Sequence, residues 1–202
     1  MNFDDSVMPL LVEAEKLKTS GQFPEAIKML QQIIVSEHNF AEAYEELADN
    51  YLSLREINRA EKALNQALHL NSDSPNAHYL LGFLYSVEQK WIKSVEELEL
   101  ADNLFPNHPE ILRCLGWSIY NQNRKNQGLA VLERSQSLNP ADPNILCDLG
   151  VCYMNSANFD KAEKTFEKVI RLAPNSDQAI ECSRFLAMLK TRKDEKFKSL
   201  KV

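Results

Sequence analysis

The spacing of glycine and proline constrains the fold of this chain more than any other feature of its sequence. Three glycines lie 34 residues apart, and two sets of three prolines share that spacing. The same register extends upstream without insertion or deletion. Self-similarity at a fixed period of this length is the signature of a repeat architecture. The defining residues are Gly82, Gly116 and Gly150, Pro75, Pro109 and Pro143, and Pro106, Pro140 and Pro174, and the copies span 7–40, 41–74, 75–108, 109–142 and 143–176.

Each copy has the pattern of two amphipathic helices joined by a short turn. Apolar and small residues recur at three- and four-residue spacings, which place them on one face of a helix. The small residues allow the two helices of a hairpin to cross closely. Ser74, Asp142 and Ser176 are good N-caps for the helices that follow them. In the second copy the pattern consists of Tyr44, Leu47, Ala48 and Tyr51, followed by Ala60, Leu64 and Ala67.

These residues resemble the tetratricopeptide repeat, a helix-turn-helix unit of 34 residues, over 7–176. The resemblance implies an all-α fold, a right-handed α-solenoid of hairpins whose first helices line a concave groove. The chain departs from the family pattern where His78 and Leu112 replace the usual tryptophan. The expected domain organisation is an N-terminal lead-in over 1–6, a solenoid over 7–189 that ends in a capping helix over 177–189, and a basic, flexible tail over 190–202.

Composition and charge exclude several classes of function. The formal net charge of −6 is unlike the basic balance of a nucleic-acid-binding protein. No run reaches the ~18 apolar residues of a membrane span, and the acidic N-terminal sequence lacks the pattern of a signal peptide. We therefore expect a cytoplasmic protein that binds neither nucleic acid nor membrane. The cysteines lack the paired spacing of a zinc site and are interpreted as buried thiols, at Cys114, Cys147, Cys152 and Cys182.

No catalytic motif is present in the sequence. There is no GxSxG elbow, no glycine-rich phosphate loop and no HExxH pair. We therefore expect no enzymatic activity, no cofactor and no metal. The prediction for function is a non-catalytic protein–protein interaction module or scaffold.

The first candidate binding surface is acidic. In the second repeat, the positions that the resemblance places in the groove carry four carboxylates within eight residues of one helix. Two interpretations stay open at the sequence level: a solvated helix face, or a docking zone for lysine and arginine of a partner. The four residues are Glu42, Glu45, Glu46 and Asp49.

The second candidate surface begins in the third repeat, where the same positions become apolar and aromatic. The two interpretations are lateral packing between neighbouring first helices, and an apolar groove for a partner, since aromatic residues and arginine are typical of binding hot spots. The groove hypothesis predicts an extended or helical partner segment with apolar anchors and a basic flank. The residues are Tyr79, Leu80, Phe83, Arg113, Cys114, Trp117, Tyr120, Cys147, Val151 and Met154.

Two further hypotheses concern different classes of function. Self-assembly is suggested by Phe185, Met188 and Leu189 in the capping helix, which is more apolar than a cap requires. A co-chaperone or secretion-chaperone type of adaptor is the weaker alternative. The carboxylate clamp of co-chaperone family members is missing at the matching places, which here carry Leu11, Glu15, Glu46, Asn76 and Leu80.

Overall fold

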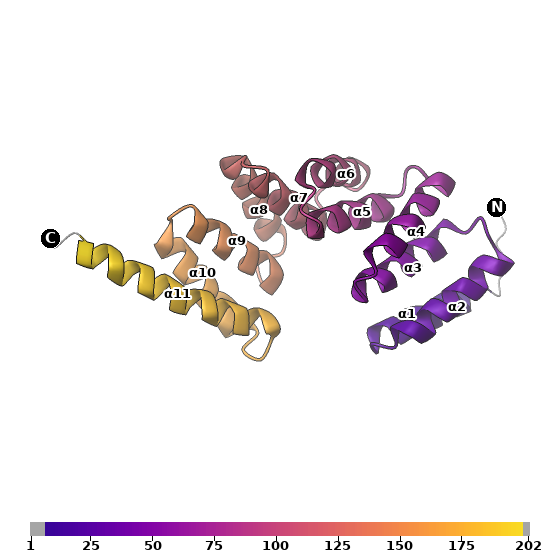
Figure 1. Ribbon diagram of the computed structural model, residues 1–202, viewed down its shortest axis with the longest axis horizontal. Helices are drawn as coiled ribbons and strands as arrows, with labels where there is room; N and C mark the ends of the chain where they lie inside the picture. Colours follow the sequence, from indigo (N-terminus) through magenta and orange to yellow (C-terminus); the bar gives the residue numbers. More distant parts are fainter. Residues whose placement is uncertain (1–6, 200–202) are drawn as a thin grey trace. The chain divides into compact units, whose positions relative to one another are not determined.

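The computed structural model describes the backbone of residues 7–199 and the side chains of residues 7–191 (Figure 1). The expected lead-in over 1–6 lies outside the described residues. All regular elements in the described part are α-helices. Successive first helices begin 34 residues apart, as the sequence period predicts. The helices are α1 (Val7–Thr19), α2 (Phe23–Ser36), α3 (Ala41–Ser53), α4 (Ile57–Leu70), α5 (Pro75–Val87), α6 (Trp91–Leu104), α7 (Pro109–Asn121), α8 (Lys125–Leu138), α9 (Pro143–Asn155), α10 (Phe159–Leu172) and α11 (Asp177–Ser199).

The predicted N-caps hold the starts of the first helices α5 and α9, and Ser176 caps α11, where its hydroxyl accepts from the Ala179 amide at 3.1 Å. The Ser74 hydroxyl accepts from the Ala77 amide at 3.1 Å at the start of α5. The Asp142 carboxylate accepts from two amides at the start of α9, the shorter at 2.8 Å from Asn144. These caps satisfy amides that have no partner inside the helix.

The two helices of each hairpin cross where the sequence carries small residues. A Cβ added to Gly116 of α7 would lie 2.9 Å from the Leu132 amide nitrogen and 3.0 Å from the Gly128 carbonyl oxygen, both on α8. A Cβ on Gly82 would lie 2.5 Å from Leu98 Cγ. Contacts this short leave no room for a side chain, so the glycines are required by close backbone approach rather than by a turn.

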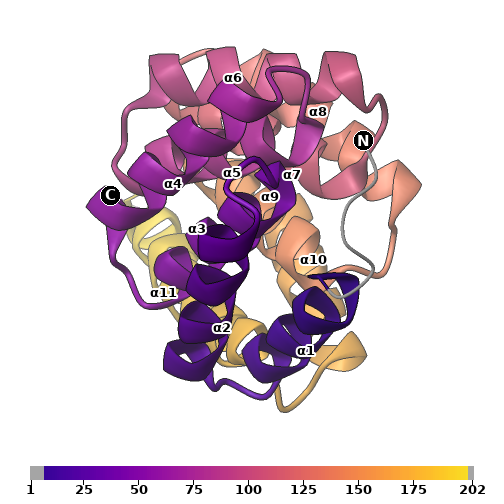
Figure 2. The ribbon, with the colours of Figure 1, turned by 90° about the vertical axis from the view of Figure 1, so that its right-hand side faces the viewer.

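The chain forms two compact units, Met1–Pro106 and Asn107–Val202. Unit 1 contains α1–α6, which are the first three repeats, and its hairpins can be followed in Figure 2. Unit 2 contains α7–α11, which are the last two repeats and the final helix. Each unit has a core of its own, with Leu64 and Leu84 among the fully buried side chains of unit 1, and Leu149 and Phe166 among those of unit 2.

The last helix is longer than the capping helix expected from the sequence. Its backbone continues to Ser199, ten residues beyond the expected end, through most of the segment expected to be a flexible tail. No glycine or proline follows Ser176, and the segment from Lys190 is rich in lysine, which favours a helix. α11 packs on α10 and α9, with the Phe185 ring 5.4 Å from that of Phe166.

Candidate partner-binding surfaces

The acidic residues predicted to line the groove lie on α3, and two of them are paired with a lysine of the preceding repeat. The Lys18 ammonium of α1 donates to Glu46 Oε2 at 2.7 Å and to Asp49 Oδ2 at 2.9 Å. Burial acts to lower the pKa of Lys18, but the two carboxylates outweigh it, and the pKa lies above its ordinary value. These three charges connect α1 to α3 within unit 1.

A third acidic residue, Glu45, is buried, with 7% of its surface exposed. One carboxylate oxygen accepts from the Ser74 hydroxyl at 2.5 Å, and the other accepts from Asn76 Nδ2 at 2.8 Å. Ser74 is also the N-cap of α5, so this carboxylate holds α3 against the start of the next repeat. Glu42 is exposed, and no ion pair involves it in the part of the chain that the structure describes.

The apolar residues predicted for the groove fall into a buried set and a half-buried set. The buried residues lie where they can pack laterally between neighbouring helices. Tyr120 is an example, because its hydroxyl donates to the Cys152 carbonyl of α9 at 3.0 Å and contacts Ser156 Oγ at 2.9 Å. The buried set is Leu80, Cys114, Tyr120, Cys147 and Met154.

The half-buried set keeps part of each side chain at the surface. Unit 1 presents Tyr79 and Phe83, both on α5, and Tyr79 packs against the core of that unit. Unit 2 presents Trp117 on α7 and Val151 on α9, and both pack against its core with one side. Phe83, Trp117 and Val151 occupy the same position of three successive repeats. The structure therefore leaves apolar surface at one repeat position in each unit.

Arg113, the cation of the predicted groove, is held by carboxylates of its own unit. Its Nη1 donates to Asp148 Oδ2 at 2.6 Å, and its Nε donates to Glu110 Oε2 at 2.9 Å. Burial acts against the charge of Arg113, but these carboxylates raise its pKa above the ordinary value. Burial raises the pKa of Asp148, and Arg113 opposes that rise. The pair ties α7 to α9.

The three residues predicted as an oligomer contact on α11 have different surroundings. Leu189 is fully buried, and Phe185 is half-buried in its stack on Phe166. Met188 is 50% exposed. Met188 and the similarly exposed Ile180 are therefore the large exposed apolar side chains among those described on α11.

The described residues contain no group of three or more His, Cys, Asp and Glu side chains placed to hold a metal ion. The four cysteines are buried, and none of them forms a disulfide. Burial raises the pKa of the Cys152 thiol. The pKa of Cys147 is raised by the contact between Cys147 and Cys182, and by burial. Within the described chain, none of the helices combines the length and apolar character needed to cross a bilayer.

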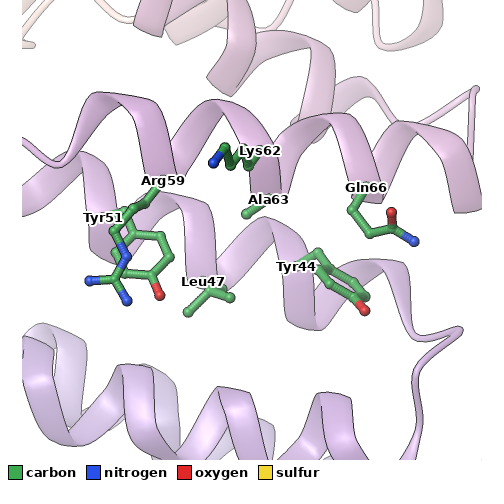
Figure 3. Close-up of a pocket in the computed structure, with 7 residues that line it drawn as sticks. All are labelled: Tyr44, Leu47, Tyr51, Arg59, Lys62, Ala63 and Gln66. Carbon is green, nitrogen blue, oxygen red and sulfur yellow. The ribbon is translucent and has the colours of Figure 1, made fainter.

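One surface feature was not predicted from the sequence. A hollow of about 280 Å³ lies on α3 and α4 and is floored by tyrosine and leucine (Figure 3). The signal that could have indicated it is the combination of Tyr44 with a small residue, Ala63, in one repeat. The lining residues are Tyr44, Leu47, Tyr51, Arg59, Lys62, Ala63 and Gln66.

Comparison with known families agrees with this architecture. Models described as tetratricopeptide repeat match residues 17–84 and 143–176. Together the two ranges cover half of the 202 residues. The chain belongs to the tetratricopeptide repeat family, and the all-α helical repeat fold predicted from the sequence is confirmed.

Individual relatives are distant. The human protein O-mannosyl-transferase TMTC3 is 28% identical over 174 residues, which are 84% of this chain and 19% of that protein. The crystal structure of the Cut9–Hcn1 hetero-tetramer of APC/C matches with a TM-score of 0.84 at 16% identity, over 93% of this chain and 37% of that one. YrrB, described as a TPR protein with an unusual peptide-binding site, matches with a TM-score of 0.63 at 18% identity. The match covers 88% of this chain and 92% of YrrB. This chain spans less than a fifth of TMTC3.

Proposed function

We propose that this chain is a non-catalytic interaction module that binds a segment of a partner protein on the faces of its first helices. The observation that carries the proposal is the half-buried apolar residue at one repeat position, Phe83 in unit 1 and Trp117 and Val151 in unit 2. Rigid helices hold these side chains, so a partner gains apolar contact without ordering a loop. Membership of a repeat family whose stacked hairpins present extended binding surfaces supports it.

The basic flank of the partner segment is the weaker part of this proposal. Lys18 already occupies the position between Glu46 and Asp49 that a partner lysine would take. A partner cation would have to displace Lys18, and the exchange of one ion pair for another contributes little affinity. The apolar anchors therefore carry the binding, and Glu42 is the acidic residue that remains for a basic flank.

The binding hypothesis is tested by capture of partners with wild-type protein and two variants, Trp117→Ala and Phe83→Ala. Truncation of a hot-spot aromatic costs ~2–4 kcal/mol of binding, so partners of these faces should be lost from the variants. Ile92→Ala is the matched control, because Ile92 is 63% exposed on the second helix α6. Circular dichroism must first establish that each variant stays folded. Partners retained by both folded aromatic variants would exclude these faces.

A second candidate function is self-assembly through α11. The observation that favours it is the exposure of Ile180 and Met188, at 51% and 50%, on a helix that no further repeat covers in the described chain. Apolar side chains on the end face of a repeat array are candidates for association. Light scattering across a concentration series tests this function, and a monomer at every concentration excludes it.

The proposal of a non-catalytic role is limited to this chain. TMTC3 is named as a transferase, but the matching part is 19% of that protein. The name of TMTC3 as a transferase is therefore not carried over to this chain.

A further inference from the structure

The hollow on α3 and α4 has the construction of a binding pocket for one side chain. Tyr44, Leu47 and Tyr51 of α3 form its floor, and Ala63 of α4 lies over Leu47 without filling the space (Figure 3). Its volume of about 280 Å³ is slightly below the ~300–1,000 Å³ of small-molecule sites. A pocket of this size suits a single large side chain of a peptide better than a cofactor.

Two cationic side chains stand beside this apolar floor, on α4 (Figure 3). The Arg59 guanidinium lies 4.3 Å from the centroid of the Tyr51 ring, and one of its nitrogens donates to Glu56 Oε2 at 2.6 Å. Stacking and pairing fix the guanidinium in place. Lys62 is exposed, and no ion pair involves it within the described residues. Lys62 therefore supplies the positive charge at the edge of the pocket, beside the Arg59–Glu56 pair.

The second repeat alone combines the features that open this pocket. The place of Ala63 is taken by larger residues in the other four repeats: Met29, Glu97, Val131 and Thr165. In the third repeat, Glu97 stands at the place of Ala63, and its Oε2 lies 2.7 Å from Nδ1 of His78, which stands at the place of Tyr44. The pocket is thus a property of this repeat and not of the family architecture.

We propose that this pocket binds an acidic segment of a partner protein that carries one aromatic side chain. The aromatic ring packs on Tyr44, Leu47 and Ala63, and a neighbouring carboxylate pairs with Lys62. Aromatic rings stack favourably on tyrosine, and a carboxylate forms a charge-assisted hydrogen bond with the lysine ammonium. This site prefers acidic partners, whereas the first-helix face at Phe83 in unit 1 and the one at Trp117 in unit 2 do not depend on any of these residues.

The test measures binding of three fluorescein-labelled peptides to the full-length protein by fluorescence anisotropy. The first peptide has one tryptophan between two pairs of aspartates in a Gly-Ser background. The second replaces the aspartates by lysines, and the third replaces the tryptophan by alanine. We expect the acidic tryptophan peptide to bind at least about tenfold more tightly than either of the others, and to weaken with added salt.

Three variants test whether the peptide binds at this pocket. Ala63→Met introduces the residue that the first repeat carries at this place and should fill the pocket, with a loss of affinity of about tenfold or more. Lys62→Glu should give a comparable loss by charge repulsion. Lys164→Glu is the matched control, since Lys164 is exposed at the same place in the fifth repeat, and it should bind as the wild type does.

Each outcome decides for or against the pocket. The proposal is supported if the protein binds the acidic tryptophan peptide selectively, if Ala63→Met and Lys62→Glu abolish this binding, and if Lys164→Glu preserves it. The proposal is overturned if the acidic and basic peptides bind equally, or if both lysine variants lose affinity equally. It is also overturned if a folded Ala63→Met protein binds as the wild type does, or if no binding is seen up to about 1 mM. Trp117→Ala should bind the peptide normally, which separates this site from the proposed first-helix faces.

Discussion

At the scale of single residues, the turn inside each hairpin contains a repeated backbone strain. The same position of all five repeats has a positive φ, between 58° and 77°, and is glycine only in the first repeat. A non-glycine residue in this left-handed region costs ~1–2 kcal/mol. Four repeats therefore carry a local cost that the surrounding helices must offset. The residues are Gly21, Arg55, Gln89, Asn123 and Ala157.

We expect Ala157→Gly to stabilise the protein, because Ala157 is exposed and its φ of 58° suits glycine. The larger backbone entropy of glycine in the unfolded chain offsets part of the gain, which leaves about 0.5–1 kcal/mol. Thermal and urea unfolding followed by circular dichroism measure the change. Ala187→Gly is the control, because Ala187 is exposed inside a helix, where glycine should cost ~1 kcal/mol. An equal loss of stability in both variants would contradict the strain argument.

At the scale of helices, a tyrosine late in the first helix joins three helices in repeats 2, 3 and 5. Its hydroxyl bonds to the second helix of the preceding hairpin, and a cation of its own second helix covers its ring. In the first and fourth repeats the tyrosine and the cation are both absent. The ring–cation pairs are Tyr51–Arg59, Tyr85–Lys93 and Tyr153–Lys161, at 4.3, 5.3 and 5.0 Å.

The middle tyrosine gives this connection a measurable pH dependence. The Tyr85 hydroxyl donates to Glu61 Oε1 at 3.1 Å, and burial together with this carboxylate raises the pKa of Tyr85 to about 12. The unfolded chain has the ordinary pKa of ~10. The contribution of Tyr85 to stability is therefore complete below pH ~10 and is lost as the pH rises from ~10 to ~12.

We expect Tyr85→Phe to lose ~1 kcal/mol at pH 8, where the hydrogen bond to Glu61 is intact in the wild type. The difference between the two proteins should shrink between pH 10 and pH 12. Urea unfolding at pH 8, 10 and 11 measures both effects. Tyr153 is present in both proteins, so its own titration affects both stabilities equally and cancels in their difference. A difference that is constant over this range would show that Tyr85 contributes only packing.

At the scale of the whole molecule, the sequence period predicted where the helices start. It did not predict which of the candidate binding residues stay exposed to solvent. Caps, prolines and close-packed glycines act within one hairpin, so a local pattern records them. The exposure of the predicted groove residues depends on the next first helix along the array. Neighbouring helices bury Tyr120 and hold Arg113, while Trp117 stays half-exposed. A lysine 28 residues away from Glu46 occupies the acidic face, and no local pattern indicates that pairing.

Within the described residues no further repeat stacks on α1 or α11, and an unstacked face of a repeat is a candidate for association between whole molecules. α1 exposes Met8 at 52% and Val12 at 47%, and α11 exposes Ile180 at 51% and Met188 at 50%. Contact between two α11 helices gives a closed, two-fold dimer. Contact between α1 of one copy and α11 of another is head-to-tail and continues into longer assemblies.

We expect Met188→Glu to abolish association in either case, because a carboxylate on this face would be buried without a partner. Met8→Glu should abolish only the head-to-tail mode, so it serves as the discriminating variant. Sedimentation velocity from about 1 to 100 μM measures the result, a range that spans the affinities expected of modest apolar contacts. A wild-type dimer that Met8→Glu leaves intact identifies the α11 contact, and a series of larger species that both variants remove identifies the head-to-tail contact. A wild-type monomer throughout this range would leave partner binding, and not self-assembly, as the function of the exposed apolar surface.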